Sequence, residues 1–303
     1  MEKPLKVLIT GSNGLLGQKL VALLANHPNT CLTACSRGVN RNPDAHGYQY
    51  EALDLTDHAS ARALISQIRP DVIIHTAAMS SVDACEADPK SCREINVLAV
   101  RNLGKVCAET GAHLIHLSTD FVFDGTEGPY REVDGMNPLS IYGKSKVESE
   151  LLLENTGCKW SVIRTILVYG VLKDLSRPTI VSWVKDNLEQ KKEIRVIDDQ
   201  FRMPTLVEDL ADACCAIAKG GHQGVYHICG KDHMSIAALA HEVAHFFGLD
   251  TSLISHVSSS ELPNAHLRPA NTGFSLEKAM HTFNYSPRSF QEGLALLAKQ
   301  WKK

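Results

Sequence analysis

A tyrosine and a lysine four positions apart are the residues with the clearest catalytic chemistry in this sequence. Tyr142 and Lys146 belong to the string Tyr-Gly-Lys-Ser-Lys, and on a helix their side chains share one face. A nearby ammonium group favours the phenolate and lowers the tyrosine pKa, so the pair can exchange a proton with a carbonyl or an alcohol. The pair follows a strand-like run that ends in Ser118-Thr119-Asp120. Because ligand chemistry is expected at such strand ends, this pattern predicts a catalytic site.

A glycine-rich turn near the start of the chain predicts a binding site for a dinucleotide. The string Gly11-Ser-Asn-Gly-Leu-Leu-Gly17 directly follows the strand-like run Lys6–Thr10 and opens a helical pattern. Glycines in this context allow a tight turn and a close approach to a pyrophosphate, and free N–H groups at the helix start attract phosphates. A purely structural turn is the alternative. The candidate cofactor contacts in this turn are Gly11, Asn13, Gly14, Leu15, Leu16 and Gly17.

The end of the second predicted strand favours NADP(H). An acidic residue is expected about 20 residues beyond the glycine turn when a ribose 2′-hydroxyl is bound. The sequence has Ser36-Arg37 there instead, and an arginine can pair with a 2′-phosphate. A solvated surface arginine is the alternative for Arg37, and NAD(H) stays open as a second cofactor. Asp54 and Leu55, at the end of the third predicted strand, are expected near the adenine, with a helix N-cap as the alternative for Asp54.

Two further motifs favour structural explanations. Tyr169 and Lys173 repeat the tyrosine–lysine spacing, but Gly170 lies between them, and we expect them in a loop. His241-Glu-Val-Ala-His245 matches a zinc-protease string. The apolar residues of this stretch fall on one helical stripe, which leaves both histidines on the polar side, and Thr251 stands where the extended motif needs a third histidine. We therefore expect no metal site.

Strand-like runs alternate with amphipathic helical patterns through the first half of the chain. Several of the runs are apolar with little alternation, as expected of strands covered by helices on both faces. This repetition predicts an α/β fold with a doubly wound parallel sheet of the Rossmann type. The predicted strands are Lys6–Thr10, Thr30–Ser36, Tyr48–Leu55, Asp71–Ala78, His113–Thr119, Trp160–Tyr169, Glu193–Asp198 and Val225–Cys229. The predicted helices are Leu15–Asn26, Ala59–Ile68, Ser91–Glu109, Val207–Lys219, Ser235–Phe247 and Ser289–Lys302.

The pattern changes after about Gly170, where a smaller C-terminal α/β domain is expected. We assign residues 1–169 to the dinucleotide-binding domain and residues 170–303 mainly to a substrate-binding domain. The chain is expected to return to the first domain around residues 193–230. Residues 170–178 are expected to form an exposed loop, and the Ser-rich stretch 255–263 is expected to separate two helices.

Composition narrows the class of protein. Of the 303 residues, 44% are hydrophobic and 21% are charged, and 31 basic against 34 acidic side chains give a net charge of −3. No basic cluster and no long apolar run is present, so we expect neither a nucleic-acid partner nor a membrane partner. The N-terminus lacks the apolar stretch of a signal peptide, and the cysteines form no Cys-x-x-Cys motif. We expect a cytoplasmic protein with reduced thiols.

Four strings resemble those of the extended short-chain dehydrogenases/reductases, and in particular the dTDP-4-dehydrorhamnose reductase family. They are Ser118-Thr-Asp-Phe-Val-Phe-Asp-Gly125, Pro138-Leu-Ser-Ile-Tyr-Gly-Lys-Ser-Lys146, Asp199-Gln-Phe-Arg-Met-Pro-Thr205 and Arg268-Pro-Ala-Asn271. The resemblance extends over essentially the whole chain. It implies a Rossmann fold, a nucleotide-sugar substrate and NADPH-dependent reduction of the C4 keto group of a dTDP-linked 6-deoxy sugar. A homodimer is a candidate assembly.

The resemblance also implies roles for individual positions. Tyr142 would donate the proton to the developing alkoxide, and Lys146 would bind the nicotinamide ribose and tune the tyrosine. Thr119 would hydrogen-bond the sugar oxygen with Asp120 beside it, and Arg268 would clamp the diphosphate, for which a guanidinium fork is suited. The cofactor's inner ribose would pass Ala77, Ala78 and Met79.

The sequence departs from the family at two places. Leu167 stands where the reductases carry a tryptophan that walls the sugar pocket, and Arg202 stands where they tend to have glycine. Leu167 cannot donate the indole hydrogen bond, so the substrate remains open. The departure supports an alternative that resembles the regulatory β subunit of methionine adenosyltransferase, in which the chain binds NADP and a partner protein. A reductase or epimerase for another sugar nucleotide is a third candidate.

Overall fold

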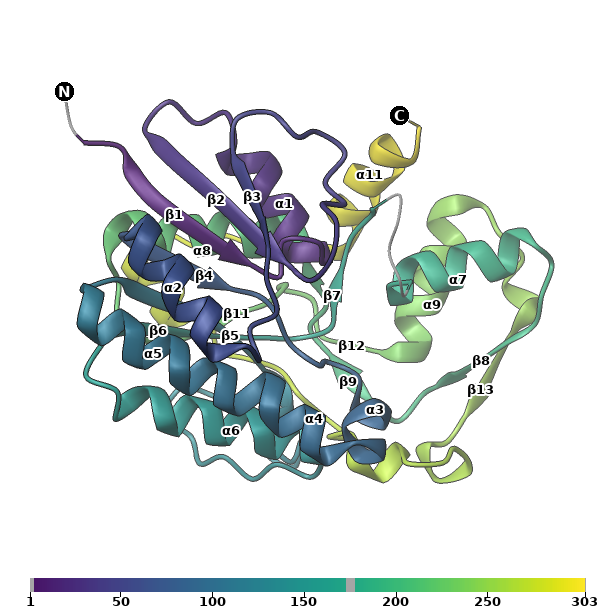
Figure 1. Cartoon of the computed structure of the whole chain (residues 1–303). Helices are drawn as coiled ribbons and strands as arrows, with labels where there is room; N and C mark the ends of the chain where they lie inside the picture. The colour runs from purple at the N-terminus through teal and green to yellow at the C-terminus, as the bar shows by residue number, and fades with distance from the viewer. Residues whose placement is uncertain (1–2, 173–177, 303) are drawn as a thin grey trace.

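A seven-stranded parallel sheet forms the centre of the protein (Figure 1). The computed structural model describes residues 3–172 and 178–302. Beside β1 the strand order reverses, with β2 on one side and β4 on the other, and this is where α/β sheets form a ligand crevice. In spatial order the strands are β11 (Gly224–Ile228), β6 (Lys159–Thr165), β5 (His113–Thr119), β4 (Val72–His75), β1 (Leu5–Thr10), β2 (Thr30–Ser36) and β3 (Gln49–Ala52).

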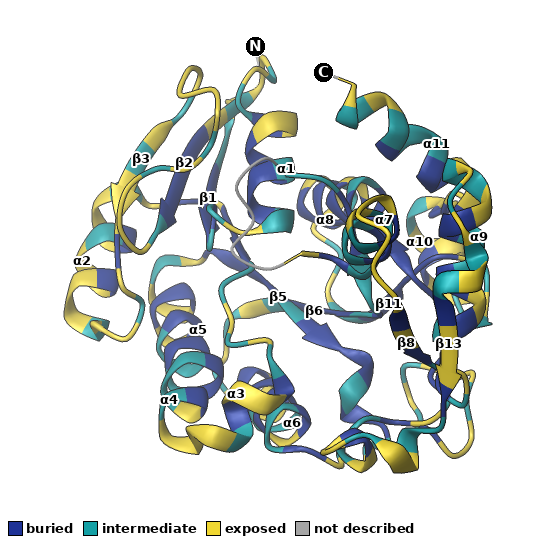
Figure 2. Cartoon of the chain, turned by 90° about the vertical axis from the view of Figure 1, so that its right-hand side faces the viewer, coloured by how far each residue is buried: buried dark blue, intermediate teal, exposed yellow. Residues whose placement is uncertain are grey.

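Helices cover both faces of this sheet. On one face α1 (Leu15–Leu24) packs against α8 (Val207–Gly220), and on the other α5 (Ala99–Thr110) packs between α2 (His58–Ile68) and α6 (Ile141–Glu154). Ile9 and Leu8 are adjacent in β1, and their side chains belong to two different apolar cores. Figure 2 shows the buried sheet between helices whose outer sides are exposed. The prediction of a doubly wound parallel sheet is confirmed.

A smaller lobe, on the right of Figure 1, has its own apolar core. Its parallel strand pair is covered by helices, and two short strand pairs, β7–β10 and β9–β12, connect the lobe to the central sheet region. The lobe contains α7 (Ile180–Glu189), β8 (Ile194–Ile197), α9 (Ile236–Phe247), β13 (Ile254–Val257) and α11 (Phe290–Trp301). The connecting strands are β7 (Val168–Tyr169), β9 (Phe201–Arg202), β10 (Thr205–Leu206) and β12 (Met234–Ser235).

The remaining elements are short. Before α5 the chain forms α3 (Val82–Ala87), α4 (Pro89–Arg93) and the π-helical turn η1 (Glu94–Leu98). The 3-10 turn η2 (Asp120–Val122) follows β5, and α10 (Glu277–Phe283) packs near β11. The other 3-10 turns are η3 (Thr251–Leu253), η4 (Ser259–Glu261) and η5 (Ala265–Leu267).

The second half of the chain is divided between the two lobes. Strand β8 pairs with β13 in the smaller lobe, whereas α8 and β11 belong to the layers of the central sheet. The domain limits 1–169 and 170–303, and the return over 193–230, stay predictions. Lys173 lies outside the described residues, as does most of the loop expected over 170–178.

Besides shifts in where several strands and helices begin or end, three predicted elements differ from the structure. Trp160–Tyr169 is two strands, because Leu167 has a left-handed backbone with φ +39° that breaks the run. Ser91–Glu109 is not one helix, because the π-turn η1 interrupts it. The Ser-rich stretch contains the end of β13, whose strand signal is weak because its two central residues are exposed.

Two global features follow from the described residues. Within residues 3–172 and 178–302, no helix combines the length and apolar character needed to cross a membrane. All nine cysteines are free thiols.

Candidate active site

The glycine turn lies at the carboxyl end of β1 and is shaped to receive phosphate groups. Gly11 has φ +73°, and a Cβ there would lie 2.6 Å from the Ala77 nitrogen. A Cβ on Gly17 would lie 2.3 Å from the Gly11 carbonyl oxygen, so α1 packs directly on the turn. Gly14 begins α1 without a side-chain cap, which leaves the first N–H groups of the helix free, and the buried Ser12 hydroxyl has no hydrogen-bond partner among residues 3–172 and 178–302. These unpaired donors fit the pyrophosphate of a dinucleotide.

Asn13 organises the loop that follows β2. Its side-chain oxygen accepts a hydrogen bond from the Arg41 backbone nitrogen at 2.9 Å, and its amide nitrogen donates to the Val39 carbonyl oxygen at 2.9 Å. The loop therefore lies beside the glycine turn and carries two exposed guanidinium groups, Arg37 and Arg41. Arg41 is absent from the predicted set, because hydrogen bonds between sequence-distant residues, such as the one from its nitrogen to Asn13, bring it to this place.

Asp54 lies beyond the end of β3 and not at the predicted strand end, because β3 ends at Ala52. Its carboxylate accepts bonds from the Thr56 backbone nitrogen at 2.9 Å and from the Thr56 hydroxyl at 2.8 Å. The backbone bond contributes most to lowering the pKa of Asp54, and Arg37 lowers it further, so the two charged groups are neighbours. The alternative of a helix N-cap is wrong, because Asp57 caps α2.

Met79, after β4, is held by a buried asparagine that the sequence analysis missed. Asn96 accepts a bond from the Met79 nitrogen at 2.8 Å and donates to the Met79 oxygen at 3.0 Å. It also donates to the Ser145 hydroxyl at 3.1 Å, which links this strand end to α6. Asn96 lies in the π-turn η1, a type of distortion that is frequent at functional sites. The only sequence signal would be an interrupted helix, which the amphipathic pattern concealed.

Tyr142 and Lys146 lie in the first two turns of α6, which Ser140 caps. The buried Lys146 ammonium donates to the Leu117 carbonyl oxygen of β5 at 2.9 Å. Burial lowers the pKa of Lys146 to about 8, and the Glu150 carboxylate opposes that change. Two of its three N–H donors remain for hydroxyl groups of a ligand.

Tyr142 is near Thr119 and Asp120, as predicted from the order of the motifs. Burial raises the pKa of Tyr142 above its ordinary value, a side-chain hydrogen bond with Thr119 opposes the rise, and the Asp120 charge adds to it. The predicted lowering of the Tyr142 pKa by Lys146 is therefore wrong, because desolvation has the larger effect on this pKa. The Phe121 ring packs edge-on against the phenol with ring centroids 5.7 Å apart.

Asp120 is buried and fully engaged with protein groups. It accepts bonds from the Thr119 hydroxyl at 3.1 Å and the Thr272 hydroxyl at 2.6 Å. The Arg202 Nε atom lies 3.6 Å from its Oδ2 atom. Burial raises the pKa of Asp120, and the Arg202 charge opposes this rise more than either hydroxyl does. The structure thus joins Asp120 to Arg202, a position that the sequence analysis marked only as a departure.

Leu167 and Arg268, two of the predicted sugar-nucleotide contacts, lie in different environments. Leu167 is half-buried and packs against apolar residues of both the smaller lobe and the region around Val122. Its positive φ costs about 1–3 kcal/mol and persists because Thr205 binds the preceding carbonyl group. The Arg268 guanidinium donates to the Asp83 carboxylate of α3 at 2.8 Å and to the Asn264 carbonyl oxygen at 3.0 Å. It therefore bridges α3 and the segment after η5.

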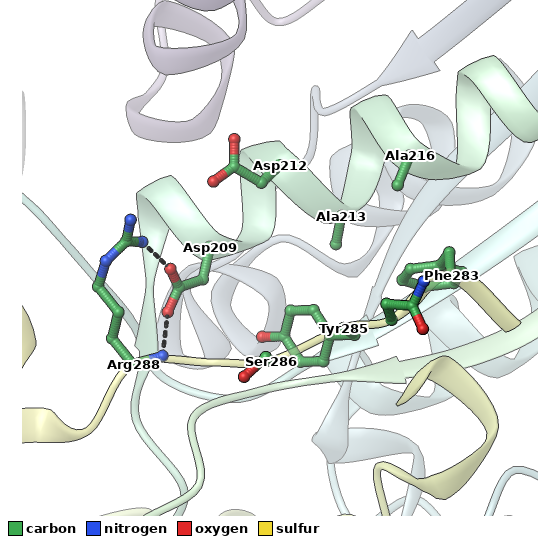
Figure 3. Close-up of a pocket in the computed structure, with 9 residues that line it drawn as sticks. Asp209, Asp212, Ala213, Ala216, Phe283, Tyr285, Ser286 and Arg288 are labelled. Atoms are coloured by element: carbon green, nitrogen blue, oxygen red, sulfur yellow. Dashed lines mark hydrogen bonds and ion pairs between the residues drawn. The ribbon is translucent and has the colours of Figure 1, made fainter. Parts of the chain in front are cut away.

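A separate cavity of about 360 Å³ lies between α8 and the segment that joins α10 to α11 (Figure 3). Its lining includes Asp209, Asp212, Tyr285 and Arg288, and Arg288 pairs with Asp209. None of the predicted cofactor or sugar contacts lines it.

The histidine motif of α9 forms no larger cluster. His241 Nε2 lies 3.0 Å from His256 Nε2 of β13, on the exposed side of the helix. Within the described ranges, no group of three or more His, Cys, Asp or Glu side chains could hold a metal ion.

Comparison with known proteins agrees with this architecture. The RmlD substrate binding domain model matches residues 5–302. Methionine adenosyltransferase 2 subunit beta of Xenopus laevis is 34% identical over 87% of this chain and 75% of its own length. The dTDP-4-dehydrorhamnose reductase of Aggregatibacter actinomycetemcomitans is 30% identical over 95% of this chain and 97% of its own length. The structure of the Bacillus anthracis dTDP-4-dehydrorhamnose reductase in complex with NADP superposes with a TM-score of 0.84, 26% identity, and coverage of 98% of this chain and 100% of that one. The chain belongs to the RmlD substrate binding domain family.

Proposed function

We propose that this chain is an NADPH-dependent reductase that converts the C4 keto group of a nucleotide-linked 6-deoxy sugar, dTDP-4-dehydrorhamnose, to the alcohol. The observation that carries the proposal is the convergence of Tyr142, Lys146 and Thr119 at the carboxyl end of β5, in the same sheet as the glycine turn. A proton donor beside a dinucleotide site is the arrangement that carbonyl reduction requires.

The cofactor assignment is supported by unpaired groups in the protein. The uncapped start of α1 and the unpartnered Ser12 hydroxyl suit a pyrophosphate. Arg37 and Arg41 supply positive charge where a 2′-phosphate would bind, and no acid occupies the end of β2. When bound, the cofactor supplies the hydride.

The protein's own part of the reaction is proton transfer. Tyr142 donates its phenolic proton to the oxygen that becomes an alkoxide, and solvent then reprotonates the phenolate. Lys146 holds ribose hydroxyls with its two free N–H donors, and its positive charge stabilises the phenolate once it forms. The raised pKa of Tyr142 keeps the phenol protonated until the substrate arrives.

On the sugar side, Arg268 would hold the diphosphate and Leu167 would wall the sugar pocket. Arg268 must first leave Asp83, to which it donates at 2.8 Å. Asp120 would contribute to sugar binding only through its hydrogen bond with Thr119, because its buried carboxylate already has three protein partners. The homodimer and the cytoplasmic location stay predictions.

A regulatory role is the second candidate. The 34% identity with methionine adenosyltransferase 2 subunit beta, and Leu167 in place of the tryptophan of the reductases, favour it. In that case the chain would bind NADP(H) and a partner enzyme, and sugar turnover would be incidental.

The deciding experiment measures NADPH oxidation with dTDP-4-dehydrorhamnose for the wild type and Tyr142→Phe. We expect turnover in the wild type and a loss of roughly 10²- to 10⁴-fold in the variant, the usual contribution of a positioned proton donor. NADPH affinity should change by no more than about twofold, because Tyr142 is one of many cofactor contacts. Tight NADPH binding without wild-type turnover would favour the regulatory role, and equal turnover in both would refute the role of Tyr142.

A further inference from the structure

Arg202 is a buried arginine that lies between Asp120 and the segment that follows Arg268. It lies on β9, has an exposed fraction of 4%, and places its guanidinium between η2 and the segment that follows η5. Its Nη2 atom donates to the Pro269 carbonyl oxygen at 2.7 Å, and its Nη1 atom donates to the carbonyl oxygens of Phe201 at 2.7 Å and Ala270 at 3.3 Å. The Nε atom faces Asp120 at 3.6 Å.

These bonds fix the segment that carries Arg268. The Ala270 carbonyl also accepts from the Phe201 nitrogen at 2.8 Å, and the Thr272 nitrogen donates to the Phe201 oxygen at 3.1 Å. The segment therefore extends β9 edge to edge, and Arg202 closes it from the buried side. Because Arg268 directly precedes two of the residues that Arg202 binds, any movement of this segment moves Arg268 as well.

The same guanidinium also sets the direction of the Thr119 hydroxyl. An ionised carboxylate can only accept hydrogen bonds, so Thr119 gives its one proton to Asp120 as long as Asp120 is charged. The Arg202 charge and the bond from Thr272 favour that charged state. The oxygen of Thr119 can then only accept further hydrogen bonds, as it does from the Phe121 nitrogen at 3.3 Å.

We infer that Arg202 and Asp120 form a buried pair that positions both halves of the reaction: Arg202 holds the segment bearing Arg268, and the paired Asp120 accepts the Thr119 proton and so fixes the direction of that hydroxyl beside Tyr142. Arg202 is a positioning residue, since it reaches the reacting atoms only through Asp120 and Thr119. The inference rests on the proposed reductase function for its kinetic consequences, whereas its structural consequence can be measured without turnover.

The structural arm compares amide hydrogen exchange in the wild type, Arg202→Met and a control, Arg195→Met. Arg195 is an exposed arginine of β8 paired with Glu261 and lies outside the candidate site. In Arg202→Met we expect amide exchange at Asn271 and Thr272 to be roughly 10- to 100-fold faster. This factor corresponds to the stabilisation that hydrogen bonds to a charged group provide. Exchange in residues 11–17 should not change, and Arg195→Met should match the wild type. Unchanged exchange at 271 and 272 in Arg202→Met would overturn the inference.

The kinetic arm separates the two roles. Arg202→Lys keeps the charge beside Asp120 but loses the guanidinium fork, so we expect a KM for the sugar nucleotide raised at least about tenfold with kcat within about threefold. In Asp120→Asn the amide can donate to Thr119, so we expect kcat to fall at least about tenfold with NADPH affinity unchanged. Equal losses of kcat and NADPH affinity in both variants would indicate general unfolding and would contradict the positioning role.

The exchange experiment also covers a wild type without turnover and an Arg202→Met variant that does not fold. If the wild type does not reduce the keto sugar, the proposed function fails, and the exchange arm alone decides whether Arg202 holds the segment. If Arg202→Met does not fold because it leaves Asp120 charged and unpaired, Arg202→Met/Asp120→Asn removes both charges and is expected to fold. Faster exchange at 271 and 272 in that double variant supports the inference, and wild-type exchange overturns it.

Discussion

The two halves of the candidate site differ in what their polar groups already bind. In the cofactor half, formed by the glycine turn, the loop after β2 and Lys146, several donors have no partner in the part of the chain that the structure describes. The Ser12 hydroxyl is buried and unpaired, and α1 begins without a side-chain cap. In the sugar half, formed by Asp120, Leu167, Arg202 and Arg268, the charged groups bind one another or their neighbours.

This difference decides what can be inferred about each ligand. Unpaired donors describe the ligand directly, because their number and charge must match it. Groups that are already paired show only which protein contacts a ligand has to replace. The cofactor class therefore follows from the cofactor half, whereas the identity of the sugar depends on positions such as Leu167 that depart from related reductases.

In the cofactor half, Lys146→Met is expected to have the largest effect, and this effect is on how the unfolding free energy depends on pH. The pKa of Lys146 is about 8 in the folded protein, against about 10.4 when unfolded. The unfolded state therefore binds more protons between these two values, and wild-type stability should rise with pH across that window. Relative to Lys146→Met, the wild type should gain about 3 kcal/mol of unfolding free energy between pH 7 and pH 10.4. Urea denaturation at several pH values measures this gain, and reduction should be lost in the variant.

Lys144→Met is the matched control, because Lys144 lies on the same helix and is exposed. Its unfolding free energy should run parallel to that of the wild type across the same pH range. If the difference in unfolding free energy between the wild type and Lys146→Met did not change with pH, Lys146 would not be desolvated. The contrast between the two halves would then no longer be supported by the charge of Lys146.

The cofactor half could be predicted well from the sequence because its signals are local. The glycines, Tyr142 and Lys146 each combine a residue type with a position in an element, and the alternation of strands and helices places them at one edge of the sheet. The misses in this half have physical causes. Arg41 comes into place through long-range hydrogen bonds such as the one to Asn13, and Asn96 depends on a π-turn inside an otherwise regular helical pattern.

The sugar half could not be predicted to the same depth because its contacts are long-range. Arg202 and Asp120 are far apart in the chain, and nothing in the spacing of the residues brings them together. The left-handed backbone of Leu167 depends on Thr205, which binds the Ile166 carbonyl oxygen at 2.5 Å. A strand prediction from β-branched residues passes over such a break, because a leucine at positive φ is rare.

A smaller effect is expected for Arg37→Ala, which tests the choice of cofactor. Removing a charge-assisted contact to a 2′-phosphate should weaken NADPH binding by roughly tenfold and NADH binding by less than about twofold. Fluorescence titration with the two cofactors measures the ratio. Arg62→Ala removes an equal charge from an exposed pair between α2 and α5 and should leave both affinities unchanged. Equal losses for the two cofactors in Arg37→Ala would remove Arg37 from the phosphate site.

The smallest effect is expected for Asp83→Asn, and it tests whether the internal pairing of the sugar half must be broken by the substrate. Arg268 donates to Asp83 at 2.8 Å, and the Asp83 side chain is 54% exposed, so the pair is worth at most about 1 kcal/mol. If Arg268 moves from Asp83 to a diphosphate, removing the competing charge should lower the KM for the sugar nucleotide two- to fivefold without changing kcat.

The control for Asp83→Asn is the same substitution in an Arg268→Gln background, where it should have no effect because the competition is already gone. Glu154→Gln removes an exposed acid at the far end of α6 and should leave the KM unchanged in either background. A higher KM in Asp83→Asn would reverse the argument: Asp83 would then hold Arg268 in its binding position, and the pairing within the sugar half would be part of a site already arranged for the substrate.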